Sequence, residues 1–279
     1  MAKSMTELLT AGILAGVLGT AANAETAHER GVVPDFSSNL AGWVANEQDF
    51  VAVPGKPGPV AADPAHPYIN NLLARRLGAQ PTFKVADLAN PNIKPWAKEV
   101  MNRENGKVLA GGIGFTPRSS CMPAGVPAFM LFPVVEPIFF VQSRKVVLMI
   151  FAGDAQIRHI YLDVPHSAHP KPSWYGESVG HYEGDTLVID TIGFNNKTYV
   201  DNFRTPHSDK LHVVERWKLA DDTMRVTFTV EDPDTFNEPW AATYSFHRIE
   251  RPLHDEEVCA ENNTLLFDYH IPIADKADF

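Results

Sequence analysis

Four charged side chains fall among apolar residues on predicted β-strands, where a charge is costly unless it is paired or used. Side chains alternate between the two faces of a strand, so residues two apart share a face. Asp190 and Glu215 each alternate with apolar residues along their strands, and so do Arg158 and Arg248. We therefore expect these two carboxylates and two guanidinium groups to share the interior of a β-structure.

Such a cluster suits acid–base chemistry on a small ligand. Asp190 or Glu215 would act as the general base or acid, and Arg158 or Arg248 would bind the ligand and stabilise developing negative charge. The alternative is an ion-pair network that sets strand register, or charges at a rim that reach water. A register shift of one residue would reverse every face.

Histidines are the next candidates for proton transfer, because they titrate near neutral pH. His207 and His212 bracket the sequence PHSDKLH, and we expect them to move protons at the mouth of a pocket. Their spacing matches no standard zinc motif, so no metal site is predicted. The alternative is that these loop histidines hydrogen-bond to local turns.

Two further side chains are candidate ligand contacts. Trp174 precedes the central predicted hairpin and could stack on a ligand, or instead plug one end of the structure. Asn195 lies in a polar loop after the next strand. The sequence has no G-x-S-x-G, P-loop, C-x-x-C or glycine-rich dinucleotide turn, so no organic cofactor is expected.

These residues lie on a succession of short strands with turn signals between them. An all-β fold is predicted: a single antiparallel eight-stranded barrel or strongly curved sheet, similar to a lipocalin. A β-sandwich with the same number of strands is the alternative. The predicted strands span residues 137–142, 145–152, 157–163, 177–182, 186–194, 212–219, 224–231 and 240–249.

The residues before the strands differ in composition. Residues 25–67 are rich in Pro, Gly, Ala and Asp, which predicts an exposed leader without regular structure. Two short helices are expected at 68–77 and 95–103, capping the barrel. Residues 68–279 are thus predicted to form a single β-rich domain.

The N-terminus has the pattern of a signal peptide. Lys3 is followed by an apolar run over residues 8–22 and by the cleavage-type sequence Ala22-Asn23-Ala24. Cleavage after Ala24 would release a periplasmic or secreted protein of about 255 residues, long enough to bury a sizeable core. An uncleaved anchor or a buried helix is the alternative.

Charge and cysteine content restrict the partners and the compartment. A formal net charge of −10 argues against binding to nucleic acid or anionic membranes, and no later segment is apolar enough to span a membrane. Cys121 and Cys259 are the two cysteines. We expect them to form a disulfide in an oxidising compartment, with two free buried thiols as the alternative.

Two long strings, PSWYGESVGHYEGDTLVIDTIGFNNKTYVDNF and PHSDKLHVVERW, resemble a large family of exported bacterial proteins. The sequence CMPAGVP at 121–127, and Cys259 with Glu261-Asn262-Asn263, extend the resemblance over roughly residues 95–265. The resemblance implies export and a polar site, and it implies no particular reaction.

Taken together, these features predict a β-barrel with a charged pocket for a small apolar or aromatic molecule. The first hypothesis is a cofactor-free enzyme of the isomerase, lyase or hydratase type. The second is a periplasmic binding protein that sequesters its ligand. The third is a structural or partner-binding protein whose charges only lock the fold.

Overall fold

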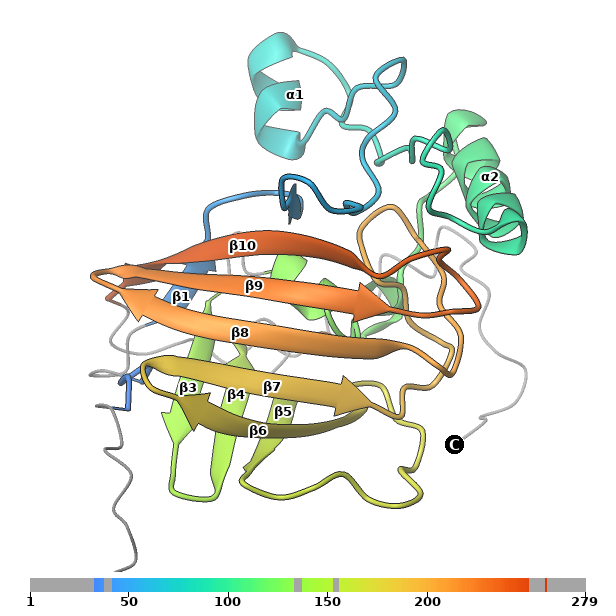
Figure 1. Ribbon diagram of the computed structural model, residues 1–279. Coiled ribbons are helices and arrows are strands. Elements are labelled where there is room, and N and C mark those ends of the chain that lie inside the picture. The colour runs from blue at the N-terminus through green and yellow to red at the C-terminus, as the bar shows by residue number, and fades with distance from the viewer. Residues whose placement is uncertain (1–32, 38–41, 133–136, 153–155, 251–258, 260–279) are drawn as a thin grey trace, which may run out of the picture. The chain divides into compact units, whose positions relative to one another are not determined.

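The computed structural model describes residues 33–37, 42–132, 137–152, 156–250 and 259 (Figure 1). The predicted signal peptide at residues 1–24 lies outside the described residues. All eight strands predicted from the sequence are present, with ends shifted by at most two residues.

Within the described residues, ten strands form one sheet. Its order is β1-β3-β4-β5-β6-β7-β8-β9-β10, and because β1 also pairs with β10, nine strands close into a barrel. β2 pairs with β10 as an additional strand outside the closed ring. The strands are Gly42–Ala45 (β1), Val51–Ala52 (β2), Ile138–Gln142 (β3), Val146–Phe151 (β4), Gln156–Leu162 (β5), Glu177–Glu183 (β6), Thr186–Ile192 (β7), His212–Ala220 (β8), Thr223–Glu231 (β9) and Trp240–Ile249 (β10).

The prediction of eight antiparallel strands was wrong in two respects, and the two are connected. An all-antiparallel closed barrel reverses direction at every step, so it needs an even number of strands. With nine strands, at least one neighbouring pair must be parallel. That pair is β5 and β6, which align through Ile160–Ser178, Tyr161–Val179 and Leu162–Gly180. Closure also excludes the sandwich alternative.

The parallel pair depends on a close approach at Gly180 of β6. A Cβ atom at this position would lie 2.9 Å from the Ile160 side chain of β5 and 2.9 Å from the Val188 carbonyl oxygen of β7. Both distances are too short for a side chain, so only glycine lets the three strands pack here.

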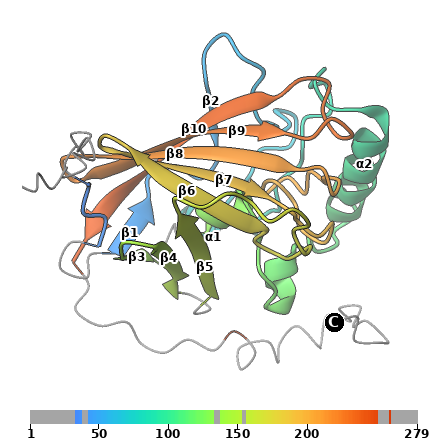
Figure 2. The same ribbon diagram turned by 60° about the horizontal axis from the view of Figure 1, so that its bottom comes forward.

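The ninth barrel strand comes from the predicted leader, which is a second correction. All four residues of β1 are buried, and β1 pairs with the last part of β10 on one side and with β3 on the other (Figure 2). Trp43 fills the interior, and its Nε1 donates a hydrogen bond of 2.8 Å to the Phe36 carbonyl. The strand is too short to show an alternating pattern, and the surrounding glycines and prolines conceal it.

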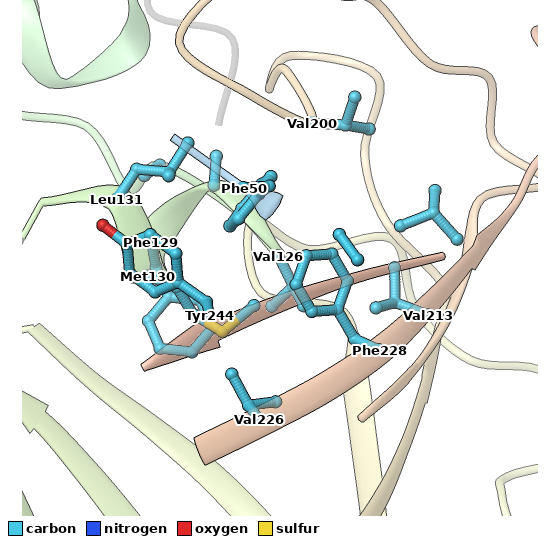
Figure 3. Close-up of a cluster of buried hydrophobic side chains, with 14 of the residues drawn as sticks. Phe50, Val126, Phe129, Met130, Leu131, Val200, Val213, Val226, Phe228 and Tyr244 are labelled. Atoms are coloured by element: carbon cyan, nitrogen blue, oxygen red, sulfur yellow. The ribbon is translucent and has the colours of Figure 1, made fainter. Parts of the chain in front are cut away.

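The barrel interior is filled with side chains (Figure 3). The short 3-10 helix Ala128–Leu131 (η3) inserts Phe129 and Met130 among residues of the last strands, including Phe228 of β9 and Tyr244 of β10. This interior resembles the packed core of a small closed barrel.

Both predicted helices are present, with different bounds. Helix α1 spans Asn71–Leu77 and is capped by Asn70, whose side chain accepts from the Leu73 amide. Helix α2 spans Pro95–Leu109, longer than the predicted 95–103. It is joined to the β9–β10 connection, because Trp96 Nε1 donates to the Asp234 carbonyl.

The predicted disulfide is confirmed. Cys121 and Cys259 are bonded, with Cα atoms 5.6 Å apart and a sequence separation of 138. The bond attaches residue 259, which follows the last strand, to the connection that leads from α2 to β3. A covalent link over so long a loop restricts the unfolded chain.

We predict that Cys121→Ser lowers the free energy of unfolding by about 2–4 kcal/mol, because the unfolded chain regains the entropy of a long open loop. Urea denaturation under non-reducing conditions measures the change. Cys259→Ser and the double variant are the matched controls and should lose the same amount. A single variant as stable as the wild type would contradict the prediction.

Candidate functional site

The interior contains one of the predicted charge pairs, Arg158 of β5 with Glu215 of β8. The two side chains are 2% and 0% exposed. Arg158 Nη1 donates to Glu215 Oε1 at 3.1 Å and Nη2 donates to Oε2 at 2.5 Å, the two-pronged geometry that is strongest between guanidinium and carboxylate. The pair reaches across the two strands that lie between β5 and β8 in the sheet.

Those two intervening strands complete the coordination of Arg158. Its Nε donates to Ser178 of β6 at 3.1 Å, and its Nη2 donates to Thr191 of β7 at 2.8 Å. The remaining Nη1 hydrogen faces the Met149 sulfur at 4.0 Å. Every N–H of the guanidinium thus has an acceptor, as a buried arginine requires.

The prediction that Asp190 shares this interior was wrong. Along β7 the inward residues are Leu187, Ile189 and Thr191, which places Asp190 on the outer face with 40% of its side chain exposed. Asp190 lies opposite Val214 in β8, while Glu215 lies opposite Ile189. The two carboxylates therefore point to opposite sides of the sheet, the reversal that a one-residue error in face assignment produces.

Asp190 instead lies between two histidines. Its Oδ1 is 2.9 Å from His212 Nε2 and 3.0 Å from His166 Nε2. The hydrogen bond with His212 holds the pKa of Asp190 below its ordinary value, and the same bond raises the pKa of His212. The other ring nitrogen of His166 lies 3.0 Å from Glu177 Oε1.

Arg248 also lies outside the Arg158–Glu215 cluster. It occupies the end of β10, where its Nη1 is 4.0 Å from Asp222 in the β8–β9 turn, and 27% of its side chain is exposed. The predicted four-residue cluster is therefore reduced to one buried pair.

His207 and Asn195 make local contacts. His207 is buried, its Nδ1 donates to the Ser208 carbonyl at 2.8 Å, and its Nε2 therefore accepts from Thr198 Oγ1 at 2.7 Å. Burial lowers its pKa. The Asn195 side chain accepts from the Lys197 amide at 3.0 Å. Both arrangements are those expected of side chains that fix loop conformation.

A cleft of about 700 Å³ opens beside β5, where the parallel ladder with β6 ends. Arg158 and Ser178 of the buried network lie at its inner part, and Trp174 lines it as a candidate ligand contact. Its further lining residues come from β5, from the 163–176 crossover, from the start of β6 and from the loop before η3. They are Pro123, Gln156, Ile157, His159, Tyr161, Ser167, His169, Lys171, Ser173, Tyr175, Gly176 and Glu177.

Most of these lining residues were missed because the sequence was interpreted as successive hairpins. The connection from β5 to β6 is too long for a hairpin and contains the sequence HSAHPKPSWYG. A connection this long between two short strands is the signal of a crossover, which parallel strands require.

The described residues contain neither a candidate metal site nor a candidate membrane-spanning helix. Over the residues that the structure describes, no group of three or more His, Cys, Asp or Glu side chains is arranged to hold a metal ion. Within the same residues, no helix has the length and apolar character needed to cross a membrane.

No family model, curated protein or solved structure matches the chain.

We predict that Glu215→Ala lowers the free energy of unfolding by about 3–5 kcal/mol, because it leaves a buried guanidinium without its counter-ion. Chemical denaturation measures the loss. Glu183→Ala is the control and should lose far less, since its ion pair with Arg216 is exposed to solvent.

A double variant separates the loss of the charge pair from a general packing defect. Combining Glu215→Leu with Arg158→Met removes both charges, and it should be more stable than Glu215→Ala alone. A double variant less stable than Glu215→Ala would refute the assignment of the loss to an unpaired charge.

The Asp190–His212 contact should make stability depend on pH. The pKa of His212 is raised in the folded protein. Its contribution to stability is therefore complete at pH values below 6.5, the ordinary pKa of histidine, and is lost as the pH rises through the folded pKa. The pKa of Asp190 is lowered in the folded protein. Its contribution to stability is therefore lost as the pH falls below 3.8, the ordinary pKa of aspartate. The contact therefore stabilises most between these two values.

We predict that Asp190→Asn costs roughly 0.5–1 kcal/mol at about pH 5.5 and close to nothing at about pH 8.5, the size expected of a half-exposed pair. Thermal or urea unfolding at both pH values measures this. The control is Asp185→Asn, whose partner Lys218 stays charged throughout, so that its effect should be the same at both. Equal losses from Asp190→Asn at the two pH values would contradict the prediction.

Proposed function

We propose that this protein binds a small apolar or aromatic molecule in the cleft between β5 and the crossover that leads to β6. The observation that carries the proposal is the cleft itself, whose volume of about 700 Å³ is within the range of small-molecule sites. Trp174, Tyr175, Tyr161 and Ile157 supply apolar and aromatic surface in it.

The filled barrel interior supports a cleft beside the strands as the binding site. Aromatic side chains and the η3 helix occupy the space inside the strands. Trp174 and Tyr175 are only partly buried, so their rings retain area for stacking on a ligand. Arg158 and Glu215 would then support the inner wall of the site, because all the N–H groups of Arg158 are already used.

Export to the periplasm or the medium is part of the proposal. The Cys121–Cys259 disulfide fits an oxidising compartment, and the N-terminal pattern is that of a signal peptide. A protein that binds small apolar molecules outside the cytoplasm would act as a carrier or scavenger.

A second candidate function is acid–base catalysis on the bound molecule. It is favoured by Glu177, a carboxylate that lines the cleft and whose pKa is lowered by hydrogen bonds from Ser167. Glu177 contacts His166, which in turn contacts Asp190. An ionised carboxylate backed by a histidine could accept a proton in an isomerase, lyase or hydratase reaction.

We predict that Trp174→Ala weakens binding of the neutral fluorescent probe N-phenyl-1-naphthylamine by about tenfold, because one stacking surface is lost. Fluorescence titration gives the dissociation constants. Trp96→Ala is the matched control: Trp96 is a partly exposed tryptophan on α2 and does not line the cleft. The proposal fails if the probe does not bind, or if the two substitutions weaken it equally.

A further inference from the structure

We infer that the molecule bound in this cleft carries a negatively charged oxygen group, a carboxylate in the simplest case, which Lys171, His159 and His169 receive. The inference rests on the proposed function and names the chemical class of its ligand. It follows from asking which charged groups of the lining are already paired and which are not.

The strongest charges at the inner end are already compensated. Arg158 is neutralised by Glu215 and has no N–H to offer a ligand. The Glu177 carboxylate accepts from the Ser167 hydroxyl at 2.5 Å and from the Ser167 amide at 2.7 Å, and it faces His166. Both oxygens of this carboxylate thus already have partners.

Three lining side chains that carry N–H donors are left without partners. Lys171, His159 and His169 line the cleft and are exposed. Within the described part of the chain, none of these three side chains has a hydrogen-bond or ion-pair partner. His159 only stacks against Tyr161, with ring centroids 6.4 Å apart. A lysine and two imidazoles offer N–H donors, which an anionic oxygen accepts.

The acidic chain around the cleft and the aromatic rings inside it indicate what kind of ligand these donors would bind. The chain as a whole has a formal net charge of −10, so a small anion is repelled over most of the surface. The charged Lys171 and the two unpaired imidazoles lie beside Trp174 and Tyr175 in the same cleft. Apolar rings next to unpaired donors match an amphipathic ligand, with an aromatic or apolar body and one anionic end.

Two probes with the same aromatic body test the inference on the full protein. The sulfonate 1-anilinonaphthalene-8-sulfonate carries one anionic group, and N-phenyl-1-naphthylamine is its neutral parent. We expect the wild type to bind the sulfonate about three- to tenfold more tightly than the parent. The advantage should shrink as salt is raised from about 0.05 M to about 0.5 M, because salt screens exposed charges.

Lys171→Met keeps the aliphatic stem and removes the charge. It should weaken sulfonate binding about threefold or more and leave the neutral probe unchanged. Lys56→Met is the control, since Lys56 is exposed and lies outside the cleft lining.

The outcomes separate this inference from the proposed function. If both probes bind in a Trp174-dependent manner but with equal affinity, or if Lys171→Met weakens them equally, the anionic group is refuted and the binding cleft stands. If neither probe binds, or if Trp174→Ala changes neither, the proposed function itself fails and the inference fails with it.

Discussion

The closed barrel formed by the described residues has an odd number of strands, and this number limits how neighbouring strands can run. Nine strands cannot alternate in direction all the way round, so one neighbouring pair must run parallel, and a parallel pair needs a crossover in place of a hairpin. In this protein the pair is β5–β6, and only three residue pairs align along it. Beyond Ile160 the two strands have no further ladder to hold them together. The cleft lies at this place, and its walls are β5 and the crossover that the parallel pairing requires.

The buried Arg158–Glu215 pair lies where the ladder stops. Arg158 is two residues from the last aligned position of β5, and its guanidinium binds one side chain from each of the next three strands: Ser178 of β6, Thr191 of β7 and Glu215 of β8. Side-chain hydrogen bonds therefore connect four consecutive strands beside the short ladder. Two apolar residues of similar volume could fill the same space, and such replacements are often neutral or stabilising. The charged pair also favours one strand register, because the five N–H groups of Arg158 reach all their acceptors in that register.

The sequence predicts most of the strands and only part of the site, for identifiable reasons. Strands such as β8 and β9 alternate cleanly because one face is buried and the other is exposed, so Glu215 could be placed inside. In β7 three consecutive residues, Leu187 to Ile189, are buried, and alternation no longer distinguishes the faces, which is why Asp190 was placed on the wrong side. β1 could not be found, because its four residues are all buried and form a strand only by joining β3 and β10. The lining of the cleft depends on the same closure, which is a property of the whole sheet.

The separation of paired from unpaired charges distinguishes residues that hold the fold from residues available to a ligand. Arg158 and Glu215 are conspicuous in the sequence because they interrupt apolar faces, yet their hydrogen-bonding capacity is used up by their neighbours. Lys171 attracts no attention in the sequence, and His169 is only one of several loop histidines, since exposed polar residues in a loop are ordinary. Their position beside partly buried aromatic rings makes them informative. A ligand in the cleft meets the side chains that folding has left without partners, and here those side chains offer N–H donors.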